Sequence, residues 1–173
     1  MNTEVLIIVF GSIVVVNAII TLLFVRFFLR HHERERKAEL LLKNQEIILP
    51  LRLQAYERLT LMLERISPES LLTRHNQSGL TSMQLQTLLL TSIRNEFEHS
   101  LSQQVYVSSK AWELVKNARH QITVLINGAA QQTKPTAPAL ELCKKILENV
   151  GEYEKLPTTI AIEFMKKEIQ MFF

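Results

Sequence analysis

The feature that most constrains this chain is a run of uncharged, mainly apolar residues near its start. The run extends from Val5 to Val25, 21 residues without a charged side chain. At roughly 1.5 Å per residue, a helix of this length covers about 30 Å, the thickness of the hydrocarbon core of a bilayer. We therefore expect residues 1–29 to form a single transmembrane helix that anchors the chain.

A cleavable signal peptide is the alternative interpretation of such a run. The segment before the apolar core of a signal peptide is basic, whereas Glu4 is the only charged side chain before Val5. The run is also longer than the roughly 7–15 apolar residues of a signal peptide. A retained anchor therefore explains the N-terminal segment better.

A basic segment follows the run directly and indicates the orientation of the anchor. Residues 26–37 hold five Lys or Arg and two Glu, a net charge of +3 that equals the formal net charge of the whole chain. Because basic residues beside a span stay in the cytoplasm, we expect the N-terminus outside and residues 30–173 inside. We interpret His31 and His32 as facing the headgroups, rather than as a pH sensor or metal ligands. The basic side chains expected to contact anionic lipid headgroups are Arg26, Arg30, Arg34, Arg36 and Lys37.

Charge and cysteine content exclude several classes of function. The sequence pI is about 9.1, but the excess positive charge lies beside the expected span, which disfavours nucleic-acid binding. A single cysteine, Cys143, excludes an internal disulfide and a CxxC metal or redox site. Because Cys143 falls in an apolar periodic segment, we expect a buried, inert thiol.

The residues after the span favour an all-α fold. Leu, Glu, Lys, Arg and Gln are abundant, and no segment shows the alternation of apolar and polar residues that is typical of a strand. We expect a basic juxtamembrane helix over residues 30–49 and an antiparallel helical bundle of about five helices over residues 50–173. Turn signals separate the helices at residues 67–68, 75–79, 133–138 and 151–157.

Pro50 and the segment after it predict a helix with two buried sides. The missing backbone donor of Pro50 predicts a kink or two abutting helices at this point. Two apolar stripes then recur at helical spacing, which places such a helix at the centre of the bundle or at an oligomer contact. One stripe holds Ile48, Leu51, Ala55, Leu59, Met62 and Ile66, and the other holds Leu49, Leu53, Tyr56 and Leu63.

A capping box predicts the start of the next helix. Thr81 and Gln84 have the spacing of a capping box, in which the side chain of each residue accepts a hydrogen bond from the backbone N–H of the other. We expect this helix to reach about Gln104, and a second helix to begin near Ser108 and end before Thr133, joined to the first as an antiparallel hairpin. The expected buried residues are Leu85, Leu89, Ile93 and Phe97 in the first helix, and Ala111, Val115, Ala118, Ile122, Leu125 and Ala129 in the second.

Two shorter helices complete the expected bundle. One covers residues 138–150, with Gly151 as its C-terminal cap. The last begins at Pro157, whose ring suits the first turn of a helix. Its apolar residues fall on two sides, Ile162, Met165, Ile169 and Phe172 on one and Ile160, Phe164 and Met171 on the other.

The residue types available limit the chemistry of the chain. It contains no aspartate, so its 17 acidic residues are all glutamate. This excludes aspartyl nucleophiles, the metal-binding aspartates of kinases, and the aspartate that accompanies a phosphate loop in ATPases. The motifs GxxxxGK[ST], GxSxG and HExxH are also absent from the sequence.

Glu96 and His99 are the only residues with the spacing of metal ligands. Separated by three positions, they match half of the Glu-x-x-His motif of di-iron bundles, but no second copy of that motif occurs. From the 100° advance per residue, Glu96 is expected to be partly buried and His99 to lie near the surface. We therefore favour a packing role, with Glu96 bonded to a neighbouring helix and Arg94 paired with Glu98. Trp112, the only tryptophan, is expected to be a half-buried packing residue.

Two stretches after the expected span resemble sequence blocks that one protein family shares. The first is PLRLQAYERL from Pro50, continuing to LERISP at residues 63–68. The second is IRNEFEH from Ile93, followed by QQVYVS at residues 103–108 and by Ala111-Trp112. Together they resemble a family of uncharacterised single-span bacterial membrane proteins. The resemblance covers most of the chain after the span, and it implies neither an activity nor functional residues.

These observations favour a membrane-anchored helical interaction or scaffold protein of a bacterial inner membrane. We expect it to bind a protein partner or a second copy of itself, without catalysis, metal or other cofactor. One rival hypothesis is a metal-dependent enzyme in which Glu96 and His99 form half of a site completed across a dimer. Another is a membrane-tethered structural stalk, although five prolines argue against an unbroken rod: Pro50, Pro68, Pro135, Pro138 and Pro157.

Overall fold

The computed structural model describes residues 3–75, 77 and 79–171, without the side chains of residues 3–9, 12–14, 28–42 and 44–45. Over these residues the chain forms six α-helices and one 3-10 helix and no β-strand, which confirms the predicted all-α class. The elements are α1 (Thr3–Arg65), α2 (Pro68–His75), α3 (Ser82–Ser100), η1 (Leu101–Val105), α4 (Ser109–Gln131), α5 (Ala139–Gly151) and α6 (Pro157–Gln170).

The chain divides into two compact units, residues 1–49 and residues 50–173. The first unit consists of the N-terminal part of α1. No helix within the described residues is both long enough and apolar enough to cross a membrane. Part of the predicted span, residues 5–9 and 12–14, lies outside the residues whose side chains are described. The same is true of the predicted headgroup contacts at Arg30, Arg34, Arg36 and Lys37 and of both neighbouring histidines.

Pro50 lies inside α1, which continues through it to Arg65. Of the two predicted alternatives, that of two abutting helices was therefore wrong, and a kink at Pro50 stays a prediction. Proline removes the donor that would bond to the carbonyl of Glu46, but the amides on either side still propagate the helix.

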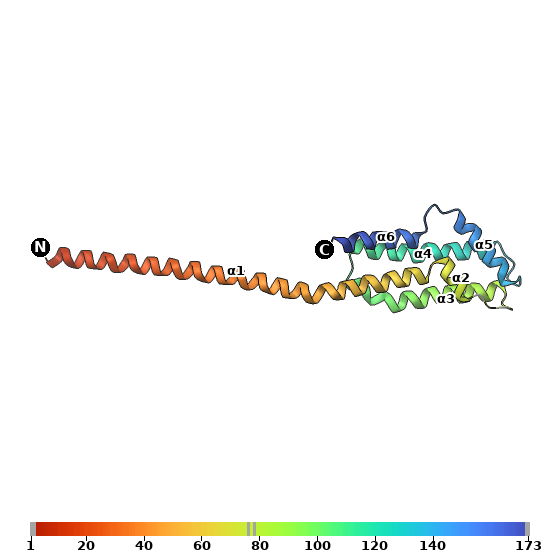
Figure 1. Cartoon of the computed structure of the whole chain (residues 1–173), viewed down its shortest axis with the longest axis horizontal. Coiled ribbons are helices and arrows are strands. Elements are labelled where there is room, and N and C mark those ends of the chain that lie inside the picture. The colour runs from red at the N-terminus through yellow and green to blue at the C-terminus, as the bar shows by residue number, and fades with distance from the viewer. Residues whose placement is uncertain (1–2, 76, 78, 172–173) are drawn as a thin grey trace. The chain divides into compact units, whose positions relative to one another are not determined.

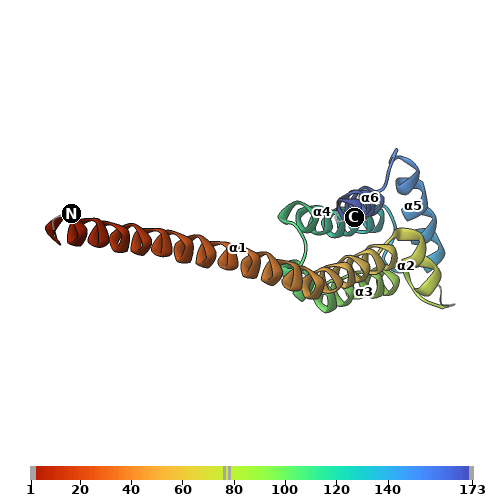
Figure 2. The ribbon, with the colours of Figure 1, turned by 60° about the vertical axis from the view of Figure 1, so that its left-hand side comes forward.

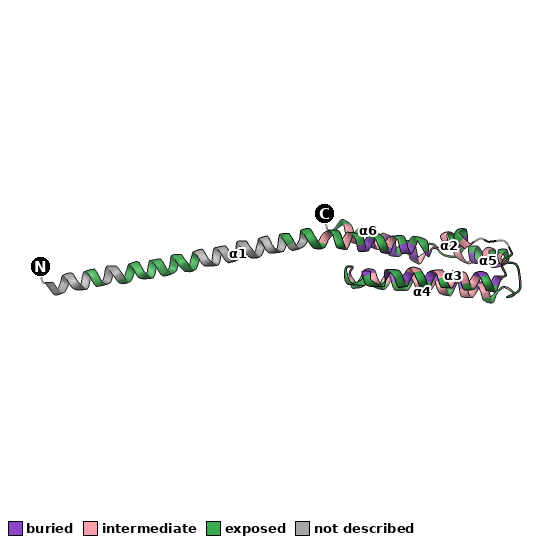
Figure 3. Cartoon of the chain, turned by 90° about the horizontal axis from the view of Figure 1, so that it is seen from below, coloured by how far each residue is buried: buried purple, intermediate pink, exposed green. Residues whose placement is uncertain are grey.

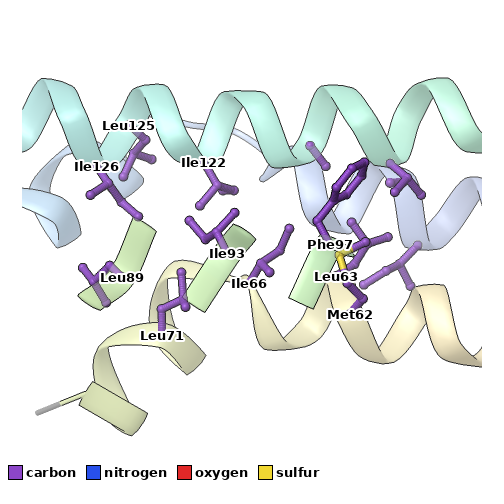
Figure 4. Close-up of a cluster of buried hydrophobic side chains, with 14 of the residues drawn as sticks. Met62, Leu63, Ile66, Leu71, Leu89, Ile93, Phe97, Ile122, Leu125 and Ile126 are labelled. Atoms are coloured by element: carbon purple, nitrogen blue, oxygen red, sulfur yellow. The ribbon is translucent and has the colours of Figure 1, made fainter. Parts of the chain in front are cut away.

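The second half of α1 packs into the core of the bundle on two sides, as its two stripes predicted. Both stripes are buried from Ala55 onward, whereas Leu51, one turn earlier, is 43% exposed. Met62 and Leu63 of this helix, and Ile66 directly after it, point toward apolar side chains of α2, α3 and α4 (Figure 4). Buried residues recur along each helix of the bundle on the sides that face its neighbours (Figure 3).

α3 and α4 form the predicted antiparallel hairpin. The capping box at its start is present, because the Thr81 hydroxyl accepts a bond from the Gln84 N–H while the Gln84 side chain accepts one from the Thr81 N–H. Cross-contacts run in opposite directions along the two helices, since Gln86 bonds to Asn127 whereas Phe97 stacks on Trp112. α3 ends at Ser100 rather than near Gln104, because the next turn tightens into the 3-10 helix η1.

α2 is a short helix between the predicted breaks, and it closes one side of the core. Its first residue is Pro68, and the Ser67 hydroxyl accepts a 3.4 Å bond from the Ser70 N–H at its N-terminus. Leu71 and Leu72 are buried against the other helices. α2 lies against α3 and α5.

α5 and α6 complete the bundle. α5 lies against α3 and α4, and α6 runs beside α4 in both views of the chain (Figures 1 and 2). Gly151 is the last residue of α5 rather than its cap, because the residue at the C-cap is Glu152, which has a right-handed helical conformation. Among the described residues only Gly79 has a positive φ, of 87°. The predicted Gly151 cap was therefore wrong.

The two sides of α6 differ, although the sequence predicted apolar contacts on both. Ile162 and Met165 are buried on the inner side. On the other side Phe164 is partly buried and packs against the core, whereas Ile160 is 44% exposed and Met171, directly after the helix, is 82% exposed. Phe172, which was assigned to the inner side, lies outside the described residues. Pro157 occupies the first turn of α6, as expected.

The predicted turn before α5 is confirmed, and it is hydrogen-bonded to the first residues of α3. The Ser82 N–H donates to the Ala137 carbonyl at 2.8 Å, and the Met83 N–H donates to the Pro135 carbonyl at 3.1 Å. Two of the N-terminal amides of α3, which lack partners within the helix, are thereby satisfied.

Candidate functional site

Glu96, the stronger of the two metal-ligand candidates, lies in an ion-pair cluster that joins three helices. Its Oε1 is 2.7 Å from Arg65 Nε of α1 and 3.4 Å from Arg74 Nη1 of α2. Arg74 also donates through Nη2 to the backbone carbonyl of Arg65. Because two guanidinium groups already neutralise this carboxylate, the arrangement disfavours a cation at Glu96 and favours a packing role.

His99 does not face the same cluster. It is exposed, and its Nδ1 lies 2.7 Å from the carbonyl oxygen of Asn95 in the preceding turn of α3. Within the described part of the chain, no three His, Cys or Glu side chains are grouped so that they could hold a metal ion. Arg94 and Glu98, expected to pair beside them, are not among the ion pairs of the described residues, so that expectation was wrong.

An aromatic stack connects α3 with α4. The rings of Phe97 and Trp112 have centroids 5.5 Å apart and an interplanar angle of 22°. The guanidinium carbon of Arg119 lies 4.2 Å from the centroid of Phe97. Trp112 and Arg119 are separated by two helical turns, about 10 Å along α4, so the Phe97 ring lies between them. Trp112 is half-buried, as predicted.

A polar junction that the sequence did not predict connects α1, the start of α4 and α6. The Ser108 hydroxyl accepts a bond from the Ala111 N–H, which caps α4, and donates to Glu168 Oε2 at 3.0 Å. The buried Tyr56 hydroxyl interacts with Ser108, Glu168 and Arg52, and burial, followed by the charge of Glu168, raises the pKa of Tyr56. We refer to these residues as the Tyr56 junction.

The signal for the Tyr56 junction is a tyrosine within an apolar stripe. A buried tyrosine hydroxyl requires a polar partner, so a tyrosine at position 56 predicts a polar contact inside the core. The sequence does not reveal the partners, because Ser108 and Glu168 reach Tyr56 only through the tertiary fold.

Cys143 is half-buried in α5 and packs against the apolar core. Burial raises the pKa of its thiol, which keeps the sulfur protonated at neutral pH and lowers its nucleophilicity. This agrees with the inert thiol expected from the sequence.

Three exposed apolar residues lie in or directly after η1, in the connection from α3 to α4. Val105 is 77% exposed, Leu101 is 41% exposed and Tyr106 is 39% exposed, and we call these three residues the η1 patch. Arg52 Nε of α1 donates to the Tyr106 carbonyl at 3.2 Å, which holds the connection against the bundle. A surface hollow of about 550 Å³ borders the patch, lined by Gln104, Ser109, Lys110, Trp112, Glu113 and Lys116.

The fold and these contacts define an all-helical bundle protein whose described polar clusters join helices to one another. Residues 2–172 match a family of unknown function, DUF7935, and the chain belongs to this family. This confirms that the resemblance noted in the sequence was to a family without an assigned function. No curated protein and no solved structure matches the chain.

Proposed function

We propose that this chain is a membrane-anchored, non-catalytic interaction protein of a bacterial inner membrane. A single N-terminal helix holds it in the bilayer, with the N-terminus outside and the bundle in the cytoplasm. The support is the uncharged run from Val5 to Val25, followed by a segment that carries a net charge of +3. In this arrangement residues 30–49 supply about 30 Å of helix between the span and Pro50.

The observation that carries the interaction role is the η1 patch. Exposed apolar side chains that lie close together in a chain are candidates for contact with a partner, and Val105 is among the most exposed apolar residues of the described chain. The adjoining hollow is lined by an indole, two lysines and a glutamate. A partner that buries apolar side chains against η1 can therefore also form hydrogen bonds and ion pairs at the edge of this hollow.

In-cell crosslinking of the full chain tests this role. Val105→Glu places a charge at the centre of the η1 patch and is expected to abolish the crosslinked species of wild type. Val124→Glu is the matched control, because Val124 is 48% exposed on α4, more than about 20 Å along the helix from η1. A chain that crosslinks to nothing, or crosslinks that survive Val105→Glu, would contradict the proposal.

A tethering role is the second candidate, and the continuity of α1 through Pro50 favours it. If α1 sets a distance from the membrane, deletion of residues 38–44, about two helical turns, is expected to remove the crosslinks at η1 while the protein stays in the membrane fraction. Unchanged crosslinks in the shortened chain would count against a distance-setting role.

A further inference from the structure

Arg94 of α3 and Arg119 of α4 line the same small cavity between these helices. The cavity has a volume of about 200 Å³, and its remaining lining consists of Leu90, Ile93 and Thr123. Ile93 is only 2% exposed, and Leu90 packs against the core, so one side of the cavity is apolar. The Thr123 hydroxyl donates to the Arg119 carbonyl at 2.9 Å, which leaves the two guanidinium groups as the main donors.

Neither guanidinium group is neutralised by a carboxylate in the described part of the chain. The arginines that flank Glu96 form ion pairs, whereas Arg94 and Arg119 form none, and Glu98, one turn from Arg94, pairs with neither. Both arginines line one cavity without a described carboxylate partner, so a bound anion would find two positive charges that no acidic side chain occupies.

Arg119 is also held in place before any ligand arrives. Its guanidinium group rests 4.2 Å from the centroid of the Phe97 ring, and Phe97 is itself packed against Trp112. A guanidinium fixed in this way loses less conformational freedom when it binds an oxyanion than a free side chain does.

We propose that this cavity binds a phosphate group, which bridges Arg94 and Arg119. A phosphate monoester carries a charge of about −1.5 to −2 at pH 7, which matches two guanidinium groups better than the single charge of a carboxylate. Its oxygens accept bidentate bonds from arginine, and the apolar wall of Leu90 and Ile93 strengthens those bonds by excluding water on one side. The phosphate belongs either to a soluble molecule or to a lipid headgroup.

Calorimetric titration of the detergent-purified full chain with inorganic phosphate, at constant ionic strength, tests the site. We expect saturable binding of one phosphate per chain, accompanied by a change in the fluorescence of Trp112, the only tryptophan. Arg94→Gln is expected to weaken binding by about tenfold or more, because it removes one charge-assisted pair of bonds. Arg94 forms no hydrogen bond or ion pair with the described residues, so this variant is expected to remain folded, whereas Arg119→Gln also removes the contact with Phe97.

Arg58→Gln is the matched control, because Arg58 is an exposed arginine of α1 that does not line the cavity. It makes the same change of charge and is expected to leave the affinity unchanged. Short-chain phosphatidic acid distinguishes the two sources: tighter binding than inorganic phosphate assigns a headgroup, and equal binding assigns a soluble phosphate. Absence of saturable phosphate binding, or an Arg94→Gln chain that binds as tightly as wild type, would overturn the proposal.

Discussion

At the scale of single residues, Glu96 is the contact that holds the ends of α1 and α2 against α3. Its side chain is 18% exposed, whereas those of Arg65 and Arg74 are 57% and 32% exposed, so solvent screens part of the attraction. Glu96→Gln is therefore expected to lower the free energy of unfolding by only about 1 kcal/mol, and by less at high salt.

Chemical denaturation measures this loss, and Glu98→Gln serves as its control. Glu98 is exposed two residues away on α3, so its substitution is expected to change stability by less than about 0.5 kcal/mol. Equal losses in the two variants would show that the ion-pair cluster does not stabilise the bundle.

The raised pKa of Tyr56 predicts how the stability of the bundle changes as the pH becomes alkaline. Because burial and Glu168 raise its pKa above the usual 10.0, the unfolded chain loses this proton at lower pH than the folded one does. The contribution of Tyr56 to stability is complete below pH 10 and is lost as pH rises through the raised pKa. Tyr56→Phe is expected to make the alkaline decrease in unfolding free energy shallower, and to cost about 1 kcal/mol at neutral pH.

Urea denaturation between neutral and strongly alkaline pH checks this expectation. Tyr153→Phe is the control, since Tyr153 is 38% exposed and its substitution should leave the alkaline decrease as in wild type. If Tyr56→Phe and wild type lose stability in parallel as the pH rises, the hydroxyl of Tyr56 is not responsible.

Local residue patterns were predictable where both partners lie within one turn of helix. Thr81 and Gln84 were identified from spacing alone, and the burial of Glu96 followed from its angle to Ile93. The partners of Glu96 and Tyr56 come from other helices, so their identity depends on how the helices pack. The Arg94–Arg119 cavity left no signal in the sequence for the same reason.

At the scale of elements, Pro50 is the feature of α1 whose effect is easiest to measure. Pro50→Ala restores an N–H that can donate to the carbonyl of Glu46, so it is expected to stabilise the helix by about 1–3 kcal/mol. Hydrogen exchange should show greater protection of the amides within one turn of residue 50.

Pro157→Ala is the matched control, because Pro157 occupies the first turn of α6, where the missing N–H has no partner within the helix. It is expected to be neutral or to destabilise by less than about 1 kcal/mol. No increase in protection around residue 50 would mean that Pro50 does not weaken α1.

The helices themselves were predictable from apolar spacing, but their ends were less so. The stripes of α3 and α4 correctly gave Ile93, Phe97 and Ile122 as buried. Gly151 was misassigned because a glycine acts as a cap only where the chain adopts a positive φ, and here the chain stays right-handed. Tightening of the turn after Ser100 into η1 depends on the path to α4, which local spacing does not encode.

For the molecule as a whole, the apolar core of the described residues lies within residues 50–173. Its buried members run from Tyr56 to Met165, and none of the side chains described in the first unit belongs to it. We therefore expect residues 50–173, expressed alone, to fold cooperatively and to melt within a few degrees of the full chain in detergent, since the core is unchanged. Aggregation of the fragment without a cooperative transition would show that residues 1–49 are needed for folding.

We propose that residues 5–25 anchor the chain with its bundle in the cytoplasm. A fusion of green fluorescent protein after Phe173 in bacterial cells, followed by alkaline carbonate extraction of the membranes, tests both the anchor and the location of the bundle. We expect fluorescence that stays with the extracted membranes, because this reporter matures in the cytoplasm and a transmembrane helix resists extraction. A fluorescent fusion recovered in the soluble fraction, or a membrane-bound fusion that is dark while an alkaline phosphatase fusion at the same point is active, would contradict it.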